Sequence, residues 1–403
     1  MTKRLRLAYL AHLPECDFER YGVRFNRERA AGNIKGGAFS TIEGAFLQGF
    51  LEQGGLDIHV ISFSPFVSEA QQIRVSDGLT IYLLPAAKFT GMSVAWIPRM
   101  LQVRRLLQKI KPDVVHGMRN IEGYGLMAVC SGFPHVVTIE EFFEGIPYPP
   151  HMKWSFWIAR QVERWVVKKA KNLVAISLHV KKTLLTMGAR GKIDVIPNVA
   201  ADIFYTVVKK APRHLLFVGR ISPEKGLLDV IHALALDECK AISPKLVVVG
   251  GSSGPEGEAY LKLCKESAAN TLAATQVEFR GWLQTHEVAK LHEEAYALIM
   301  TSTAKYEGMG VVIVEALAAG TPVITYDFGP MPELVCNGKT GYVISVGNIS
   351  AMADAIIDSH QSAESNFQSI DVYRSAAAIY TTEEVTRCYL KLFKKIYDKK
   401  HSA

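Results

Sequence analysis

The stretch from Glu307 to Glu333 reads EGMGVVIVEALAAGTPVITYDFGPMPE, and it guides the interpretation of the whole chain. It opens with a carboxylate in a glycine-rich loop and continues into an apolar helical run that carries Glu315. Gly320 is placed to end that helix, and Pro322 begins a short apolar run typical of a buried strand. We therefore predict a loop, a helix and a strand, in that order.

The start of the predicted helix is suited to binding an anion. The backbone N–H groups of Gly310, Val311 and Val312 have no partner inside the helix, and the helix dipole places partial positive charge at the same end. Two carboxylates beside a phosphate would repel it unless they accept hydrogen bonds from nearby hydroxyl groups. Glu307 and Glu315 therefore favour a nucleotide-sugar ligand. The alternative is a buried helix with two incidental glutamates.

This stretch resembles the donor-binding region of the retaining GT-B glycosyltransferases of family 4. The resemblance rests on the spacing Glu307-x7-Glu315, on the run EALAAGTPVI, and on the later segment NGKTGYV. It is strong over about residues 170–345 and diffuse before them. It implies a GT-B fold, in which two Rossmann-like doubly wound α/β domains face a central cleft. It also implies that Glu307 holds hydroxyls of the transferred sugar and Glu315 those of the ribose.

A second motif, LLFVGRISPEKG, starts at Leu215 and precedes another apolar helical run. A strand, a glycine, an arginine and a loop lysine in this order form a turn suited to an anion. Arg220, which follows Gly219, can bind two phosphate oxygens with its planar guanidinium, and Lys225 adds a compact charge. The motif is close to the family's diphosphate-binding signature. The alternative is a surface arginine and lysine beside an ordinary turn.

The resemblance implies two further substrate contacts. A predicted strand ends near Trp282 and Leu283, where the family's backbone meets the nucleotide base, although a buried tryptophan is the simpler interpretation of Trp282. Gly36 and Gly37 lie between a predicted strand and a helix, where backbone can approach a phosphate closely. The alternative for this glycine pair is a tight turn.

One strand of the N-terminal half departs from the family pattern. The family commonly ends this strand with Thr-x-His, whose histidine approaches the transferred sugar. Here Thr138 is followed two residues later by Glu140. The departure argues against a histidine-based role and leaves Glu140 as a candidate substrate contact. An acidic surface loop is the alternative.

The length of 403 residues, with 49% hydrophobic and 21% charged residues, is typical of a two-domain α/β protein. We predict an acceptor-binding domain over residues 1–198, joined by a C-terminal helix over 383–403, and a donor-binding domain over 213–382. No apolar run reaches membrane-spanning length, and the first residues do not form a signal-peptide pattern. Six scattered cysteines without a CxxC pair indicate reduced thiols and a cytoplasmic location.

The net charge of +7 is unevenly divided along the chain. Residues 1–200 hold 26 Lys and Arg against 16 Asp and Glu, or +10, and residues 201–403 hold 20 against 23, or −3. A basic N-terminal half suits an anionic or lipid-linked acceptor, or contact with the anionic cytoplasmic face of a membrane. Clustered solubility charge is the alternative. We expect no nucleic-acid partner.

The segment 152–171, MKWSFWIARQVERWVVKKAK, predicts an amphipathic helix. Trp154, Trp157 and Trp165 fall on one stripe, and the lysines and arginines lie away from it. Tryptophan combined with basic residues is typical of an interfacial helix on anionic lipid. The same pattern fits a helix docked on a domain core. We favour this second interpretation, because three tryptophans on one stripe pack efficiently in a core.

The predicted reaction transfers a sugar from a nucleoside-diphosphate sugar to a glycan, lipid-linked or other anionic acceptor, in cell-surface polysaccharide or glycoconjugate synthesis. Retention of anomeric configuration is implied by the resemblance alone. Arg220, Lys225 and the amides near Gly310 would stabilise the diphosphate as it leaves. The chain has no Asp-x-Asp pair, so we expect no divalent metal and no cofactor.

Three other functions stay open at this point. A GT-B epimerase or phosphorylase would use similar residues. A non-catalytic subunit that binds a nucleotide-sugar or a glycan would need the same contacts without the chemistry. A nicotinamide dehydrogenase is disfavoured, because no GxGxxG opens the first strand–helix unit.

Overall fold

A computed structural model describes residues 4–13, 42–65, 67–86, 92–119, 122–144, 146, 148, 152–272, 276–365 and 370–402. The chain divides into two compact units. The first unit comprises Met1–Asn198, Lys305–Met309 and Thr382–Ala403, and the second comprises Val199–Ala304 and Gly310–Thr381. Each unit has its own sheet.

The short segment Lys305–Met309 packs with the first unit, although the sequence division placed it inside the donor domain. The Ser177 hydroxyl donates a 2.8 Å hydrogen bond to the carbonyl oxygen of Gly308. A Cβ at Gly308 would overlap the carbonyl oxygen of Glu140. A close backbone contact that only glycine permits therefore holds the Glu307 loop to the first unit.

The first unit is built on an eight-stranded sheet with the order β3-β4-β2-β1-β5-β6-β7-β8. Its strands are β1 (Leu5–Leu10), β2 (Leu56–Ser64), β3 (Gln71–Ser76), β4 (Leu79–Pro85), β5 (Val114–Met118), β6 (His135–Ile139), β7 (Asn172–Ala175) and β8 (Lys192–Val195). All neighbours are parallel except β3 and β4. The antiparallel edge strand β3 was not predicted, because its alternating half-exposed pattern lacks the apolar run of a buried parallel strand.

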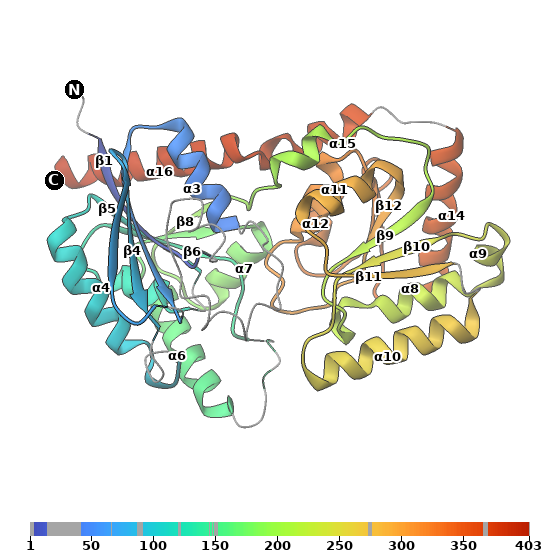
Figure 1. The fold of residues 1–403 in the computed structure, drawn as a ribbon, viewed down its shortest axis with the longest axis horizontal. Helices are drawn as coiled ribbons and strands as arrows, with labels where there is room; N and C mark the ends of the chain where they lie inside the picture. Colours follow the sequence, from blue (N-terminus) through green and yellow to red (C-terminus); the bar gives the residue numbers. More distant parts are fainter. Residues whose placement is uncertain are drawn as a thin grey trace. The chain divides into compact units, whose positions relative to one another are not determined.

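Helices cover both faces of this sheet, as Figure 1 shows for α3 and α16 on one side and α4 and α6 on the other. The helical elements are α3 (Ile42–Gln53), η1 (Met92–Val94), α4 (Ile97–Ile110), α5 (Tyr124–Val129), α6 (Lys153–Lys169), α7 (Leu178–Thr186) and α16 (Thr382–His401). The C-terminal helix α16 packs on α3, where the ring of Tyr389 lies 5.2 Å from that of Phe46 and 6.0 Å from that of Phe50. These buried aromatic contacts attach the end of the chain to the first unit.

The second unit has a six-stranded parallel sheet with the order β11-β10-β9-β12-β13-β14. Its strands are β9 (His214–Val218), β10 (Leu246–Val249), β11 (Val277–Gly281), β12 (Ala295–Met300), β13 (Val323–Tyr326) and β14 (Gly341–Ile344). Its helical elements are η3 (Asp202–Thr206), η4 (Pro223–Lys225), α8 (Leu227–Leu234), α9 (Asp237–Ala241), α10 (Gly254–Thr271), α11 (Thr285–Glu294), α12 (Val311–Ala318), α13 (Met331–Leu334), α14 (Ile349–Ser365), α15 (Ile370–Ala377) and η5 (Ala378–Tyr380). The strand order is that of a Rossmann-like doubly wound sheet, which confirms the predicted fold class.

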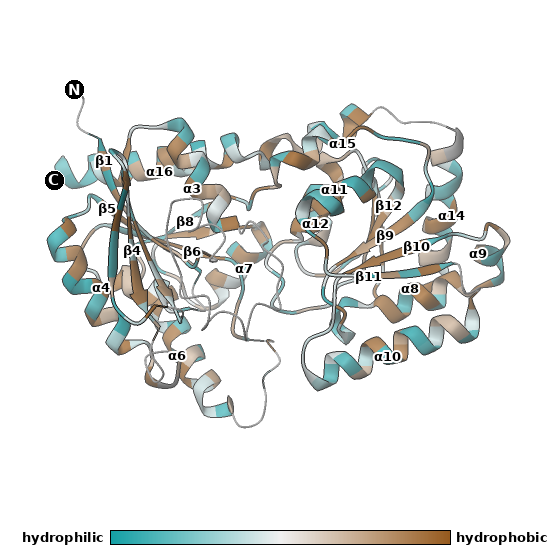
Figure 2. Ribbon diagram, in the orientation of Figure 1, coloured by the Kyte–Doolittle hydropathy of each residue, from teal (hydrophilic) through white to brown (hydrophobic). Residues whose placement is uncertain are grey.

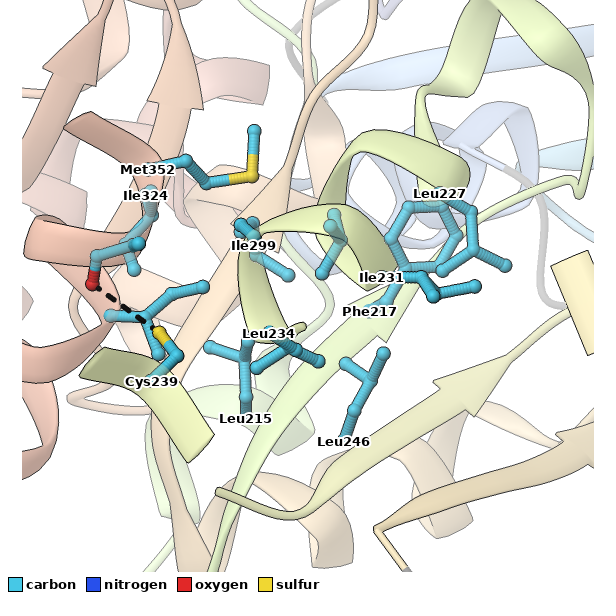
Figure 3. Close-up of a cluster of buried hydrophobic side chains, with 14 of the residues drawn as sticks. Leu215, Phe217, Leu227, Ile231, Leu234, Cys239, Leu246, Ile299, Ile324 and Met352 are labelled. Atoms are coloured by element: carbon cyan, nitrogen blue, oxygen red, sulfur yellow. Dashed lines mark hydrogen bonds between the residues drawn. The ribbon is translucent and has the colours of Figure 1, made fainter. Parts of the chain in front are cut away.

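The core of the second unit lies between its sheet and the helices α8, α9 and α14 (Figure 3). Leu215, Ile299 and Ile324 from three neighbouring strands are all buried there. The Cys239 thiol donates a weak 3.7 Å hydrogen bond to the carbonyl oxygen of Ala353. Figure 2 shows the strands β9 and β10 as hydrophobic, as expected for parallel strands that are covered on both faces.

The cysteines that the structure describes are all free thiols, as the sequence predicted; they are Cys130, Cys239, Cys264, Cys336 and Cys388. Within the described ranges, no helix combines the length and apolar content needed to cross a bilayer.

Candidate active site

The carboxyl ends of the parallel strands in the second unit meet at one edge of its sheet. The strand order reverses at this edge between β9 and β12, and doubly wound sheets bind ligands outside such a point. Gly219 and Arg220 directly follow β9, and Lys225 lies in the short η4 turn. Gly310 directly precedes α12, which follows β12 along the chain. The structure therefore brings the predicted phosphate-binding residues to the same edge.

The loop that carries Arg220 and Lys225 is fixed against the end of β12. The Thr301 hydroxyl donates a 2.9 Å hydrogen bond to the carbonyl oxygen of Lys225. Gly226 has a φ of 70°, and a Cβ there would lie 2.6 Å from the carbonyl oxygen of Thr301. This left-handed conformation with no space for a side chain requires glycine. In this loop the Arg220 side chain is exposed and the Lys225 side chain is half-buried.

Helix α12 begins as the sequence predicted, with Gly310 before its first residue. A Cβ at Gly310 would lie 3.0 to 3.2 Å from three neighbouring side chains, so the backbone here is closely packed. Val311 and Val312 are half-buried in the first turn, which contains no acidic residue. The positive end of the helix dipole is therefore not neutralised by a carboxylate of its own first turn.

Glu315 is half-buried in α12 and has no ion pair or side-chain hydrogen bond among the described residues. Burial raises the pKa of its carboxyl to about 8. Burying a carboxyl without a partner lowers stability, and such groups gather at functional sites. Hydroxyl groups of a ligand would supply the missing hydrogen bonds.

The strand β11 leads into Trp282 and Leu283 at the same edge of the sheet. A Cβ at Gly251, after β10, would overlap the indole Nε1 of Trp282, so the ring lies directly on this glycine. Trp282 is 49% exposed, and its interpretation as a buried tryptophan is therefore wrong. Leu283 is half-buried beside it. The predicted base contact thus adjoins the loops that follow β9 and β10.

The other two predicted site residues, Glu307 and Glu140, belong to the first unit. Glu140 directly follows β6 and is 7% exposed, so its interpretation as part of an acidic surface loop is wrong. The backbone contact between Gly308 and Glu140 brings these two segments together. The predicted glycine pair, Gly36 and Gly37, lies outside the described residues.

The structure also contains an ion-pair cluster at the carboxyl edge of the first sheet that no sequence motif indicates. Arg119 Nε lies 2.6 Å from Glu43 Oε1 and 3.1 Å from Glu140 Oε2. Glu43 stands in the first turn of α3 and is 1% exposed, and Arg119 directly follows β5. The strand order of this sheet reverses between β1 and β5, so the cluster occupies the corresponding ligand-binding position of the first unit.

The cluster holds two carboxyl groups around one guanidinium group. Burial raises the pKa of Glu140 to about 8. The positive charge of Arg119 opposes this rise, and the negative charge of Glu43 adds to it. Burial also raises the pKa of Glu43, again with Arg119 opposing it. One oxygen of each carboxylate has no hydrogen-bond partner among the described residues. Two carboxylates around one guanidinium favour retention of a proton near neutral pH.

The solved structures include close matches to this architecture. Sucrose-phosphate synthase from Thermosynechococcus elongatus superposes with a TM-score of 0.73 at 15% identity, covering 98% of this chain and 100% of that one. Two doubly wound parallel units and this likeness define a GT-B fold.

Two family models match consecutive parts of the chain: Glycosyltransferase Family 4 over residues 47–200, and Glycosyl transferases group 1 over residues 200–368. The chain belongs to the group 1 glycosyltransferases, enzymes that depend on a nucleoside-diphosphate sugar.

Similar proteins support this assignment. Glycogen synthase of Mycobacterium tuberculosis (strain CDC 1551 / Oshkosh) is 27% identical over 336 residues, which are 76% of this chain and 78% of that protein. The GDP-mannose-dependent alpha-(1-6)-phosphatidylinositol monomannoside mannosyltransferase of the same organism is 33% identical over 146 residues, 35% of this chain and 36% of that protein.

Replacing Arg119 by Gln should destabilise the protein more at high pH than at low pH. Removing one partner of a buried ion pair costs about 3–5 kcal/mol, because the remaining charge stays buried. Burial raises the pKa of Glu140 to about 8, so this carboxyl is neutral at about pH 5 and the cost is then smaller. The urea midpoint, followed by circular dichroism at about pH 5 and about pH 9, measures the difference. Adding Glu140→Gln should restore part of the loss at high pH; an Arg119→Gln midpoint equal to that of the wild type at both pH values would contradict the cluster.

Replacing Glu315 by Gln should stabilise the ligand-free protein at high pH. Burial raises the pKa of Glu315 to about 8, so the folded protein favours the neutral carboxyl group. The stability that the neutral group permits is fully present at low pH and is lost as the pH rises towards that value. The Gln variant lacks this loss, so its urea midpoint should exceed that of the wild type at about pH 9 and equal it at about pH 4.5. A lower midpoint at the higher pH would show that the carboxylate has a stabilising partner.

Proposed function

We propose that this protein transfers a sugar, with retention, from a nucleoside-diphosphate sugar to a glycan or lipid-linked acceptor in the synthesis of cell-surface polysaccharide or glycoconjugate. The observation that carries this proposal is the arrangement of Arg220, Lys225 and the start of α12 at one edge of the second sheet. Two cationic side chains and a helix N-terminus at the strand-order reversal suit a diphosphate.

The proposed role of these groups follows from where charge develops during the reaction. As the bond between the anomeric carbon and the diphosphate oxygen breaks, the leaving diphosphate gains negative charge. The guanidinium of Arg220, the ammonium of Lys225 and the first amides of α12 stabilise that charge more in the transition state than in the ground state. Glu315 accepts hydrogen bonds from ribose hydroxyls, and Glu307 accepts them from the transferred sugar.

Retention follows from attack on the same face of the sugar that the diphosphate leaves. The acceptor hydroxyl oxygen forms the new bond to the anomeric carbon, and its proton passes to an oxygen of the departing diphosphate. This route requires no covalent enzyme intermediate, and the donor motifs contain no residue that we assign as a nucleophile. The family resemblance supports this stereochemistry.

The acceptor is proposed from the relatives and from the first unit. One relative is named a glycogen synthase and another a phosphatidylinositol monomannoside mannosyltransferase, which supports a polysaccharide or a lipid-linked acceptor. We place the reaction at the cytoplasmic face of a membrane. The carboxylates of Glu43 and Glu140 suit a sugar hydroxyl at the strand-end edge of the first unit, with the anionic part of the acceptor elsewhere.

Alanine substitutions at Arg220 and Lys225 test the role of the cationic groups. The donor is first identified by thermal shift with UDP-, GDP- and ADP-sugars, because a ligand that binds only the folded state raises its stability. Arg220→Ala and Lys225→Ala should each lower transfer by about 100-fold, as loss of a group that stabilises developing charge does. Arg213→Ala is the matched control, since this side chain is 68% exposed in the same unit. Near-unchanged transfer in either test variant would remove that residue from the mechanism, and donor isomerisation without acceptor would indicate an epimerase.

We also propose that transfer needs no divalent metal. The cationic side chains supply the charge that Mg²⁺ supplies to a diphosphate in other enzymes. Transfer should keep its full rate in excess chelator. Loss of activity in chelator that is restored by Mg²⁺ or Mn²⁺ would contradict this proposal.

A further inference from the structure

Helix α6 exposes its tryptophans instead of burying them. Trp154 is 67% exposed, Trp157 is 51% exposed and Trp165 is 41% exposed. The preferred interpretation of the tryptophans as core is therefore wrong, because α6 buries a stripe that includes Phe156, Ala159 and Val166 and leaves the three indole rings exposed. The rings of Trp154 and Trp157 stack with centroids 5.0 Å apart and form a continuous exposed aromatic surface.

The charged side chains on the exposed side of α6 have a single sign. The exposed basic residues of the helix are Lys153, Arg164, Lys168 and Lys169, and Arg160 is half-buried. The one acidic residue of α6, Glu163, is 2% exposed and accepts a 3.2 Å hydrogen bond from the N–H of Phe143. Its charge is therefore directed into the unit, and no carboxylate of α6 faces solvent.

Helix α4 extends this surface. The η1 turn, which precedes α4, packs against α6, and Val94 in that turn is 37% exposed. Ile97 and Leu101 on α4 are 51% and 44% exposed. Arg104 and Arg105 are exposed on the same helix, which has no acidic residue. Figure 2 shows both hydrophobic and hydrophilic residues on these two helices.

We refer to this surface as the α4–α6 face. Its exposed apolar residues are Val94, Ile97, Leu101, Trp154, Trp157 and Trp165. Its exposed basic residues are Arg104, Arg105, Lys109, Lys153, Arg164, Lys168 and Lys169. Apolar side chains gathered with charges of one sign identify an interaction surface for an anionic partner.

We propose that the α4–α6 face binds peripherally to an anionic lipid bilayer, with Trp154 and Trp157 inserted at the headgroup level. Tryptophan prefers this level because its ring is apolar and its N–H can stay hydrated, and basic residues around it attract anionic lipid. The inference rests on the proposed function for the membrane location of the acceptor, and it adds the residues and the lipid charge.

A bilayer explains this surface better than a second copy of the chain does. A symmetric dimer through the α4–α6 face would bring seven basic side chains opposite the same seven, with no exposed carboxylate of either helix to compensate them. An anionic bilayer supplies both the opposite charge and an apolar layer for the rings.

Vesicle flotation of the full chain tests the proposal. The wild type should float with vesicles of phosphatidylcholine mixed with phosphatidylglycerol, and should stay unbound with phosphatidylcholine alone. Trp154→Ala combined with Trp157→Ala should weaken binding by roughly tenfold or more, because two aromatic side chains no longer leave water. Arg164→Gln and Lys168→Gln should each weaken it by about fivefold, and added salt should weaken binding of the wild type.

The matched control is Val208→Ala combined with Ile379→Ala, which removes side chains that are 73% and 61% exposed in the second unit. The control should bind vesicles as the wild type does. Donor binding and transfer to a water-soluble acceptor should be unchanged in the tryptophan variant, because Trp154 and Trp157 are outside the proposed site. Loss of vesicle binding alone therefore separates this proposal from the proposed function.

Three results would overturn the proposal. The first is equal flotation with both vesicle compositions. The second is unchanged flotation of the tryptophan variant. The third is a dimer in lipid-free solution that dissociates on the Trp154→Ala and Trp157→Ala substitutions while vesicle binding is absent, since it would assign the face to a second copy.

Discussion

Close backbone packing at the carboxyl ends of β9, β10 and β12 is the constraint on which the candidate donor site depends. A Cβ at Gly250 would overlap the carbonyl oxygen of Gly219, and one at Gly226 would lie 2.6 Å from that of Thr301. Side chains at these positions would push the strand ends and their loops apart. Glycine allows the loop with Arg220 and the loop before α12 to share one edge, which is the position of the proposed diphosphate site.

The first unit separates its charges between two regions. The sequence assigns +10 to residues 1–200, which suggested an anionic acceptor in general. The structure places exposed basic residues on α4 and α6, whereas the strand-end edge holds the carboxylates of Glu43 and Glu140 around Arg119. A basic helical face and a strand-end edge that carries two carboxyl groups support the proposal of an acceptor whose anionic anchor and whose sugar bind at different places.

The sequence predicted the elements that carry the candidate donor residues well, because local rules determine these elements. Glycine after a buried strand, an apolar run with a glycine at its end, and a basic loop each have a recognisable pattern, and β9, α8 and α12 all begin and end near the expected residues. The family resemblance then assigned roles that local patterns alone leave open.

Other features depend on contacts between distant parts of the chain. Arg119 adopts a left-handed backbone conformation with a φ of 56° and pairs with Glu43, which is remote in the sequence. Its position directly after a buried strand was the one signal that could have identified it. The packing of Lys305–Met309 with the first unit also depends on the fold. Periodicity showed that the tryptophans of α6 share a stripe but not which stripe faces the sheet.

Hydrogen–deuterium exchange of the full chain with and without its nucleotide-sugar donor tests the central claim most directly. If the donor binds at the strand-order reversal of the second sheet, amides of residues 219–226 and 310–315 should become protected when it is added. Amides at the opposite edge, such as those near residues 337–341, should exchange as before. Protection confined to that opposite edge or to the first unit would contradict the assignment of the donor site.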